Sequence, residues 1–384
     1  MTFEIGSEVA RAFFRSETMD TAKVLVVGGY GEVGRRVSEG LVRSGEVRVV
    51  IAGRREEEAT RFASELSEVA GGEEVSARHI DLGERPGFEA AIRDIDVVVM
   101  CVDAPDAHAA LTTVQAGKGY VDISADDRLL TSIEALESRA IAAGGRALLS
   151  VGLAPGLTNL LGAEVMRRSG QNSEVSLWIE LGMGDVHGEA AIGWMLDHLD
   201  TRFQVRGPDG WREVRSLESY RTLRWPEEPH PRRYYPFPFA DQASLVRRST
   251  ARSVETRFRL SSGVITGALA WLSRMGGARA LRHNALRQMA IGGLQSFARG
   301  TDRWRVAASA KAGTSSGDTT FVMGMEGAGE SRATATVAVA AVKKLLSGDV
   351  AAGIWHLHQV MGLSSLVDAL QGDDPNVRVS TWTL

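Results

Sequence analysis

The stretch that most limits how this chain can fold is Val-Leu-Val-Val-Gly-Gly-Tyr-Gly-Glu-Val-Gly at residues 24–34. Its first four residues are apolar and mostly β-branched, which predicts a buried strand of a parallel sheet. Residues 35–44 form an amphipathic run and predict a helix directly after the glycines. A strand, the pattern G-x-G-x-x-G and a helix, in this order, are typical of a loop that holds the pyrophosphate of a dinucleotide.

Each glycine of this loop has a steric reason to be there. We expect Gly29 to allow the tight turn, Gly31 to let the backbone approach a phosphate, and Gly34 to let the helix pack closely. The N–H groups at the start of the helix would then point at the pyrophosphate. The cofactor contacts predicted from the loop are Gly29, Tyr30, Gly31, Glu32, Val33 and Gly34. The alternative is a glycine-rich turn that binds no ligand.

The end of the second strand indicates which dinucleotide is bound. Residues 47–55 predict this strand, and a site for NAD usually carries Asp or Glu at its end. Gly53, Arg54 and Arg55 stand there instead. A guanidinium binds a 2′-phosphate through paired, charge-assisted hydrogen bonds, so we expect NADP, held by the two arginines. The alternative is that both arginines only begin the solvated helix expected at residues 56–69.

Strands and helices alternate as far as residue 151. Further strands are expected at residues 75–80, 96–102, 120–124 and 147–151. This alternation predicts a doubly wound parallel sheet with the cofactor along its carboxyl edge. At that edge we expect Asp81, Val102 and Ser124 to contact the cofactor. Asp81 could instead cap a turn, and Ser124 could cap the next helix.

The pattern changes after residue 151. Strands are expected at residues 175–183, 203–206, 211–214, 254–260, 304–310 and 319–325, and a long loop at 225–239. We therefore predict a second, α+β domain with an open mixed or antiparallel sheet. The expected division is a helical extension at residues 1–20, an NADP-binding domain at 21–154, a substrate or dimerisation domain at 155–330, and a helical segment at 331–384 that packs back on the first domain.

Composition excludes several classes of function. A net charge of −4 and a pI near 6.1 argue against nucleic acid as a partner. The single cysteine, Cys101, suits a reducing compartment. No apolar run is long enough to span a membrane, and the charges within residues 1–20 do not fit a signal peptide. We expect a cytoplasmic protein with no membrane partner. No metal site is expected, because His356 and His358 do not share a helix face.

Several segments, taken together with the glycine loop, resemble the saccharopine dehydrogenase (saccharopine reductase) family. They are Ala52-Gly-Arg54, the strand at 97–102, Gly119-Tyr-Val-Asp-Ile-Ser124 and Gly152-Leu-Ala-Pro-Gly-Leu-Thr-Asn-Leu160. The resemblance is clear over residues 23–166 and weaker beyond. It implies a homodimer in which NADP exchanges a hydride with a carbon–nitrogen bond, imine or amine, of a small amino-acid-derived substrate.

Ala154 departs from the pattern of this family. The saccharopine-forming enzymes resemble Gly-Leu-Asp-Pro-Gly at this segment, so a carboxylate that could bind or protonate an amine is missing here. Two alternatives therefore stay open. One is an oxidoreductase that acts on a non-amino-acid carbonyl substrate, and the other is a protein that senses NADP without turnover.

His187 is the first candidate for a catalytic acid or base, because a group with a pKa near 7 serves this purpose well. It belongs to a glycine-rich loop, residues 182–188, that we expect to face the cleft between the domains. A surface histidine near a helix start is the alternative. Asp122, at the end of a strand on the cofactor edge, is the second catalytic candidate, and it could instead cap the next helix. Asn159 follows Pro155 and Gly156 and is the predicted substrate contact.

Overall fold

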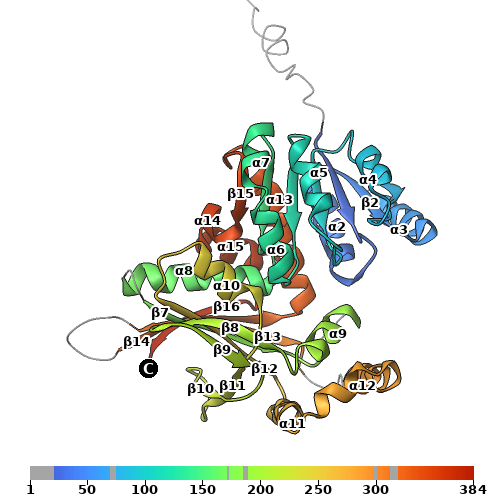
Figure 1. Ribbon diagram of the computed structural model, residues 1–384. Helices are drawn as coiled ribbons and strands as arrows, with labels where there is room; N and C mark the ends of the chain where they lie inside the picture. The colour runs from blue at the N-terminus through green and yellow to red at the C-terminus, as the bar shows by residue number, and fades with distance from the viewer. Residues whose placement is uncertain (1–20, 70–74, 171–172, 185–188, 297–300, 312–318) are drawn as a thin grey trace, which may run out of the picture.

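A parallel sheet of seven strands forms the first domain (Figure 1). The computed structural model describes residues 21–69, 75–170, 173–184, 189–296, 301–311 and 319–384. The strands are β1 Lys23–Val27, β2 Arg48–Gly53, β3 Ser76–His79, β4 Val97–Met100, β5 Gly119–Asp122, β6 Arg146–Leu149 and β15 Gly353–His356. Their order, β15-β6-β5-β4-β1-β2-β3, contains the 3-2-1-4-5-6 order of dinucleotide-binding domains. The predicted doubly wound sheet is confirmed.

Helices cover both faces of this sheet. They are α2 Glu32–Ser44, α3 Glu56–Val69, α4 Arg85–Ala91, α5 His108–Gln115, α6 Asp127–Glu134, α7 Glu137–Ala143 and α13 Glu330–Leu346. Alternate residues of β1 enter different cores: Val24 and Val26 pack with α2 and α13, whereas Leu25 and Val27 pack with α4, α5 and α6. Burial on both faces explains why the central strands are continuous apolar runs.

A mixed sheet of nine strands forms the second domain, below the first in Figure 1. The strands are β7 Glu174–Leu181, β8 Arg202–Gly207, β9 Gly210–Arg215, β10 Arg221–Leu223, β11 Arg232–Pro236, β12 Ser253–Leu260, β13 Arg303–Lys311, β14 Thr320–Ala328 and β16 Arg378–Thr383. Strands β7 and β12 are parallel, and the other described pairs of this sheet are antiparallel. The predicted mixed sheet is confirmed.

The remaining helices cover one face of the second sheet or project from its edge (Figure 1). They are α8 Thr158–Ser169, α9 Glu189–Asp197, α10 Ala240–Arg247, α11 Gly263–Arg274, α12 Asn284–Ser296, α14 Leu357–Val360 and α15 Leu363–Asp373, with a short 3₁₀ turn at Gly277–Arg282. None of the helices within the described ranges is long and apolar enough to cross a membrane.

The prediction of a long loop at residues 225–239 was partly wrong, because this segment contains β11. This strand pairs with β12, with Tyr235 opposite Phe258. Its charged and aromatic residues suggested a loop, because the partners that let them lie in a sheet are distant in the sequence. Arg232 forms ion pairs with Glu180 and Glu228, which allows a basic residue to lie within the sheet.

Residues 331–384, expected to be helical, also contain two strands. Strand β15 extends the first sheet beside β6, and β16 extends the second sheet beside β14. Helix α13 packs against α2 of the first domain. The segment predicted to pack back on the first domain therefore contributes to both sheets.

Candidate functional site

The glycine loop joins β1 to α2 with little free space. A Cβ at Gly34 would lie 2.1 Å from the Gly28 carbonyl oxygen, so α2 packs directly on the loop. The tight turn was expected at Gly29, and the residue of this turn with a left-handed backbone, φ of 77°, is Gly28. Gly29 is needed for space, since its Cβ would lie 2.9 Å from the Val26 carbonyl oxygen.

The start of α2 is left open for a ligand. Gly31 is the N-cap residue and makes no side-chain cap. The first N–H groups of an α-helix have no partner within the helix, and here no side chain caps them. Such a helix start attracts phosphate. The loop therefore fits the pyrophosphate of the predicted cofactor.

The end of β2 distinguishes the two arginines predicted to bind the 2′-phosphate. The Arg55 guanidinium pairs with Glu58 at 2.8 Å and lies 5.2 Å from the centre of the Tyr30 ring. Arg54 is exposed and makes no ion pair or hydrogen bond with any described residue. The Tyr30 ring packs on Gly53, where a Cβ would lie 2.5 Å from the tyrosine hydroxyl. Arg54 therefore presents the guanidinium that is available to NADP.

Two predicted residues on the carboxyl edge hold turns. The Asp81 carboxylate accepts a hydrogen bond from the Gly83 N–H at 2.8 Å, which is the turn-capping alternative. Asp122 is fully buried and accepts hydrogen bonds from the Tyr120 hydroxyl at 2.6 Å and the Ser124 N–H at 2.7 Å. Burial raises the pKa of the Asp122 carboxyl to about 6. Asp122 thus fixes the position of Ser124, which lines the cavity described below, and does not line that cavity itself.

Asn159 does not reach the site. Its side chain is fully buried and its amide accepts a hydrogen bond from the Gly156 N–H at 3.0 Å. The same amide donates to the Asp241 carbonyl oxygen and to the Ser244 hydroxyl. All these hydrogen bonds are made within the protein, so the prediction that Asn159 contacts substrate is corrected. Asn159 instead connects the Pro155-Gly156 segment to α10. His187 lies outside the described residues.

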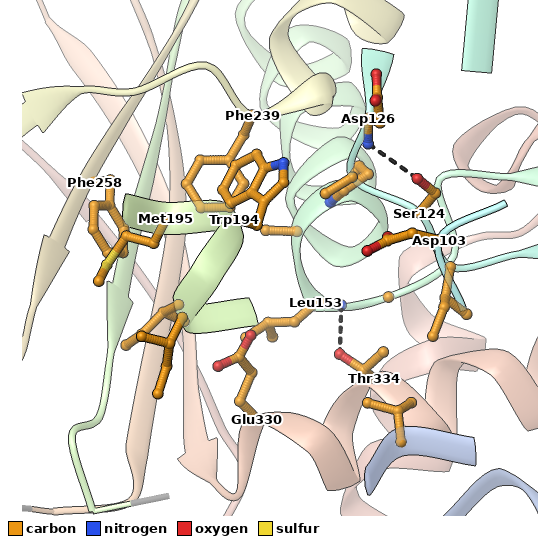
Figure 2. A pocket seen from close by; sticks show the side chains of 18 of the residues that line it. Asp103, Ser124, Asp126, Leu153, Trp194, Met195, Phe239, Phe258, Glu330 and Thr334 are labelled. Carbon is orange, nitrogen blue, oxygen red and sulfur yellow. Dashed lines mark hydrogen bonds between the residues drawn. The ribbon is translucent and has the colours of Figure 1, made fainter. Parts of the chain in front are cut away.

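A cavity of about 500 Å³ lies between the carboxyl edge of the first sheet and the second domain (Figure 2). Val33 of the glycine loop, Val102 after β4 and Ser124 after β5 line it from the first domain. The nicotinamide end of a dinucleotide reaches this side of a doubly wound sheet. The cavity therefore joins the cofactor site to a space for substrate.

The second domain gives this cavity an apolar wall that the sequence analysis did not identify. Its residues are Leu181, Met183, Ile192, Trp194, Met195, Phe237, Phe239, Phe258 and Leu260. The Trp194 ring centre lies 5.6 Å from that of Phe237 and 5.2 Å from that of Phe239. Phe237 and Phe258 are 5.1 Å apart and buried. Contacts among the rings keep this aromatic wall in one arrangement.

The charged side chains among the described residues of the cavity are all acidic. Asp103 and Asp126 lie on the side of the first domain, and Glu330, in the first turn of α13, points into the cavity from another side (Figure 2). Burial, together with the nearby Asp126 carboxylate, raises the pKa of Asp103. Asp126 also caps α6 by accepting from the Arg128 N–H at 2.8 Å. Among the described lining residues there is no Lys, Arg or His.

Within the described parts of the chain, no three His, Cys, Asp or Glu side chains are placed to hold a metal ion. His356 instead lies in a fully buried position, with one ring nitrogen 2.8 Å from the Ser150 hydroxyl and the other 3.1 Å from a Glu134 oxygen.

Comparisons with known proteins agree with this site. Residues 24–148, about a third of the chain, match the family model described as saccharopine dehydrogenase NADP binding domain. The sequence resemblance is confirmed over this domain, and its cofactor is NADP. No curated protein matches the sequence.

One solved structure extends the likeness in fold to both domains, and a second is reported beside it. An apo histidine-tagged saccharopine dehydrogenase (L-Glu forming) from Saccharomyces cerevisiae is 14% identical, with a TM-score of 0.65. The alignment covers 94% of this chain and 100% of that one, so the two share a fold. An engineered D-amino acid dehydrogenase is 13% identical over 92% of this chain and 99% of its own, with a TM-score of 0.45.

Proposed function

We propose that this chain, whose first domain matches the saccharopine dehydrogenase NADP-binding domain, exchanges a hydride between NADP and a carbon–nitrogen bond. The match and the shared fold support an NADP-dependent oxidoreductase. The observation that carries the choice of bond is the cavity, which begins at the glycine loop and whose described charged residues are all carboxyls. A carboxyl exchanges a proton with a nitrogen readily, and an imine must gain or lose a proton when a hydride is transferred.

Different residues of the site have different roles in this reaction. The bound nicotinamide supplies or accepts the hydride. Val33, Val102 and the aromatic wall exclude water and hold the substrate against the first domain. Asp103 lines the cavity and is a second candidate to exchange a proton with substrate, and the raised pKa of its carboxyl is in the direction that suits this role.

His187 remains a proposed acid or base. Its loop connects β7 to α9, and residues on both sides of the loop, Met183 and Ile192, line the cavity. We therefore keep His187 as a candidate for proton exchange with bound substrate. A homodimer and a cytoplasmic location, both expected from the sequence, belong to the same proposal, and light scattering checks the first.

The test is a turnover assay with matched substrates. Purified protein with NADPH would be given aldehydes or ketones alone, and the same compounds with ammonia or a primary amine, which form imines. We expect NADPH oxidation only when the nitrogen compound is present. Equal rates with the carbonyl compound alone would favour a carbonyl oxidoreductase and contradict the proposal.

A second candidate function is NADP sensing without turnover. The observation that favours it is Ala154, which lines the cavity at the place of the family's carboxylate. Tight NADPH binding with no turnover on any imine, amine or carbonyl compound is the result that this candidate predicts. Turnover of any of them excludes a pure sensor.

A further inference from the structure

Helices α11 and α12 project from the edge of the second sheet and expose large apolar side chains (Figure 1). Five of the thirteen large apolar residues that are exposed in the described chain belong to this pair. They are Val264, Trp271, Met275, Leu286 and Met289, and between 44% and 84% of each residue is accessible to solvent. Single exposed apolar residues are common, whereas a group of them marks a surface for a partner.

The exposed apolar residues lie on the side of each helix that faces away from the protein. Val264, Trp271 and Met275 are seven and four residues apart, so they share one face of α11. The opposite face of α11 packs on the protein, and its buried residues are Thr266, Ala270 and Ser273. On α12, Leu286 and Met289 are exposed and Ile291, on the other side, is buried. The outward sides of both helices are therefore apolar.

The segment that contains these helices is also basic. Residues 261–301 include five arginines and no aspartate or glutamate, although 48 of the 384 residues of the chain are acidic. Arg274 is exposed, and its guanidinium donates to the Glu218 carbonyl oxygen at 2.7 Å, which leaves its charge in place. Arg287 pairs with Asp197 of α9 at 2.8 Å. An apolar surface within a basic segment suits a partner that is both apolar and negatively charged.

We propose that α11 and α12 dock the protein on the surface of a bilayer that contains anionic lipids. Such a bilayer has an apolar interior for the exposed side chains and negative headgroups for the arginines. A tryptophan such as Trp271 is favoured at the level of the headgroups. A second copy of the chain fits less well, because a two-fold interface brings the same segment against itself. Arginines would then face arginines, and the segment has no carboxylate of its own to pair with them.

This proposal changes the expectation that the protein has no membrane partner. That expectation came from the lack of an apolar run long enough to span a bilayer. A helix that lies on the surface does not need such a run, because only one of its faces enters the lipid. The proposal does not depend on the reaction, since it concerns a surface and not the cavity.

The first experiment measures vesicle binding by sedimentation. Full-length protein is mixed with vesicles of phosphatidylcholine, or of phosphatidylcholine with an equal amount of phosphatidylglycerol, which is anionic. We expect the protein to sediment with the mixed vesicles and much less with phosphatidylcholine alone. Added salt should weaken binding to the mixed vesicles, because it screens the attraction between arginine and phosphate.

Substitutions then assign the binding to the two helices. Trp271→Ser combined with Met289→Ser should weaken binding to the mixed vesicles by at least about tenfold. The matched control is Trp211→Ser, which removes a tryptophan of β9 that is 55% exposed, against 65% for Trp271, and should change nothing. Arg274→Gln should weaken the same binding by about fivefold. Its control is Arg93→Gln, at an exposed arginine of the first domain.

Light scattering and NADPH titration of each variant complete the test. Lost vesicle binding with unchanged oligomeric state and NADPH affinity would support the proposal. It would be overturned if the wild type bound neither vesicle, bound both equally, or bound as the double variant does. Loss of self-association in the double variant would show that a second copy covers this face, which also overturns it. None of these outcomes requires turnover, so the proposed reaction is tested separately.

Discussion

Arg54 has the clearest individual role among the residues of the cofactor site. Because its guanidinium is exposed and has no partner among the described residues, it is available to the 2′-phosphate of NADP. We predict that Arg54→Ala weakens NADPH by about 10- to 100-fold and leaves NADH unchanged. Arg55→Ala is the control and should have a smaller effect, since Arg55 is paired with Glu58. Fluorescence titration measures all four affinities, and equal losses for both cofactors would contradict the assignment.

His187 is tested by the separation of turnover from binding. If it exchanges a proton with substrate, His187→Ala should lower kcat by about 100-fold or more and leave the affinity for NADPH unchanged. Stopped-flow measurement of NADPH oxidation with a competent imine gives kcat, and titration gives the affinity. An unchanged kcat would remove His187 from the catalytic residues.

His358 makes the stability of the fold depend on pH. Burial, the neighbouring His356 ring and the Arg248 guanidinium lower the pKa of His358 to about 3. An unfolded histidine titrates near 6.5, so below that pH the unfolded state binds the proton and the folded state does not. The free energy of unfolding is therefore unaffected by His358 above pH 6.5 and decreases as the pH falls from 6.5 toward 3.

Because of His358, the free energy of unfolding should be about 1 kcal/mol lower at pH 5.5 than at pH 7.5. Urea unfolding at both pH values measures this decrease. Between pH 7.5 and pH 5.5, the stability of His358→Leu should fall less than that of the wild type. His79→Leu, an exposed histidine at the end of β3, is the control. The comparison between variants is needed because Asp122 and Asp241, with pKa values raised to about 6, act in the opposite direction. Parallel pH dependences in wild type and His358→Leu would be against this origin.

At the scale of elements, α2 can be tested through two glycines that differ in their surroundings. A Cβ at Gly34 would lie 2.1 Å from backbone, whereas one at Gly267, within α11, would meet nothing within 4 Å. Gly34→Ala should lower the free energy of unfolding by about 1–3 kcal/mol and weaken NADPH, because the loop must shift. Gly267→Ala should raise it by about 0.5–1 kcal/mol. Thermal and urea unfolding measure both, and similar effects at the two sites would contradict the steric explanation.

The sequence predicted elements well where local pattern determines them. The central strands are buried on both faces, so each is a short apolar run between turn residues, and these were found. Strands β11, β15 and β16 were missed for a different reason. Their partners lie far away in the sequence, and β11 carries arginines whose charges are balanced by Glu180 and Glu228. Nothing in the residues nearby indicates those partners.

The same distinction explains which parts of the site were predicted. The glycine loop and Arg54 occupy one continuous unit, so their chemistry could be recognised from spacing. The cavity is assembled from Asp103, Trp194, Phe239 and Glu330, which only the packing of the two domains brings together. Asn159 was misplaced because a helix start near the cleft can also turn its side chain inward, as it does here.

At the scale of the whole molecule, the two domains should unfold together. Helix α13, β15 and β16 connect both sheets, and the cavity is lined from both sides. We predict a single thermal transition whose midpoint rises with NADPH concentration, as mass action requires when only the folded state binds. Calorimetry with and without NADPH checks this. Two transitions, of which NADPH shifts only the first, would show that the domains are independent.

The place of β15 in the first sheet also affects how the protein is made. Its neighbour β6 ends the run of strands formed from the first part of the chain, yet β15 is translated about 200 residues later. At ordinary ribosome speeds this delay is roughly 10 to 40 s. During that time the outer edge of β6 has exposed N–H and C=O groups and no partner strand. The first domain is therefore completed only after most of the second has been synthesised.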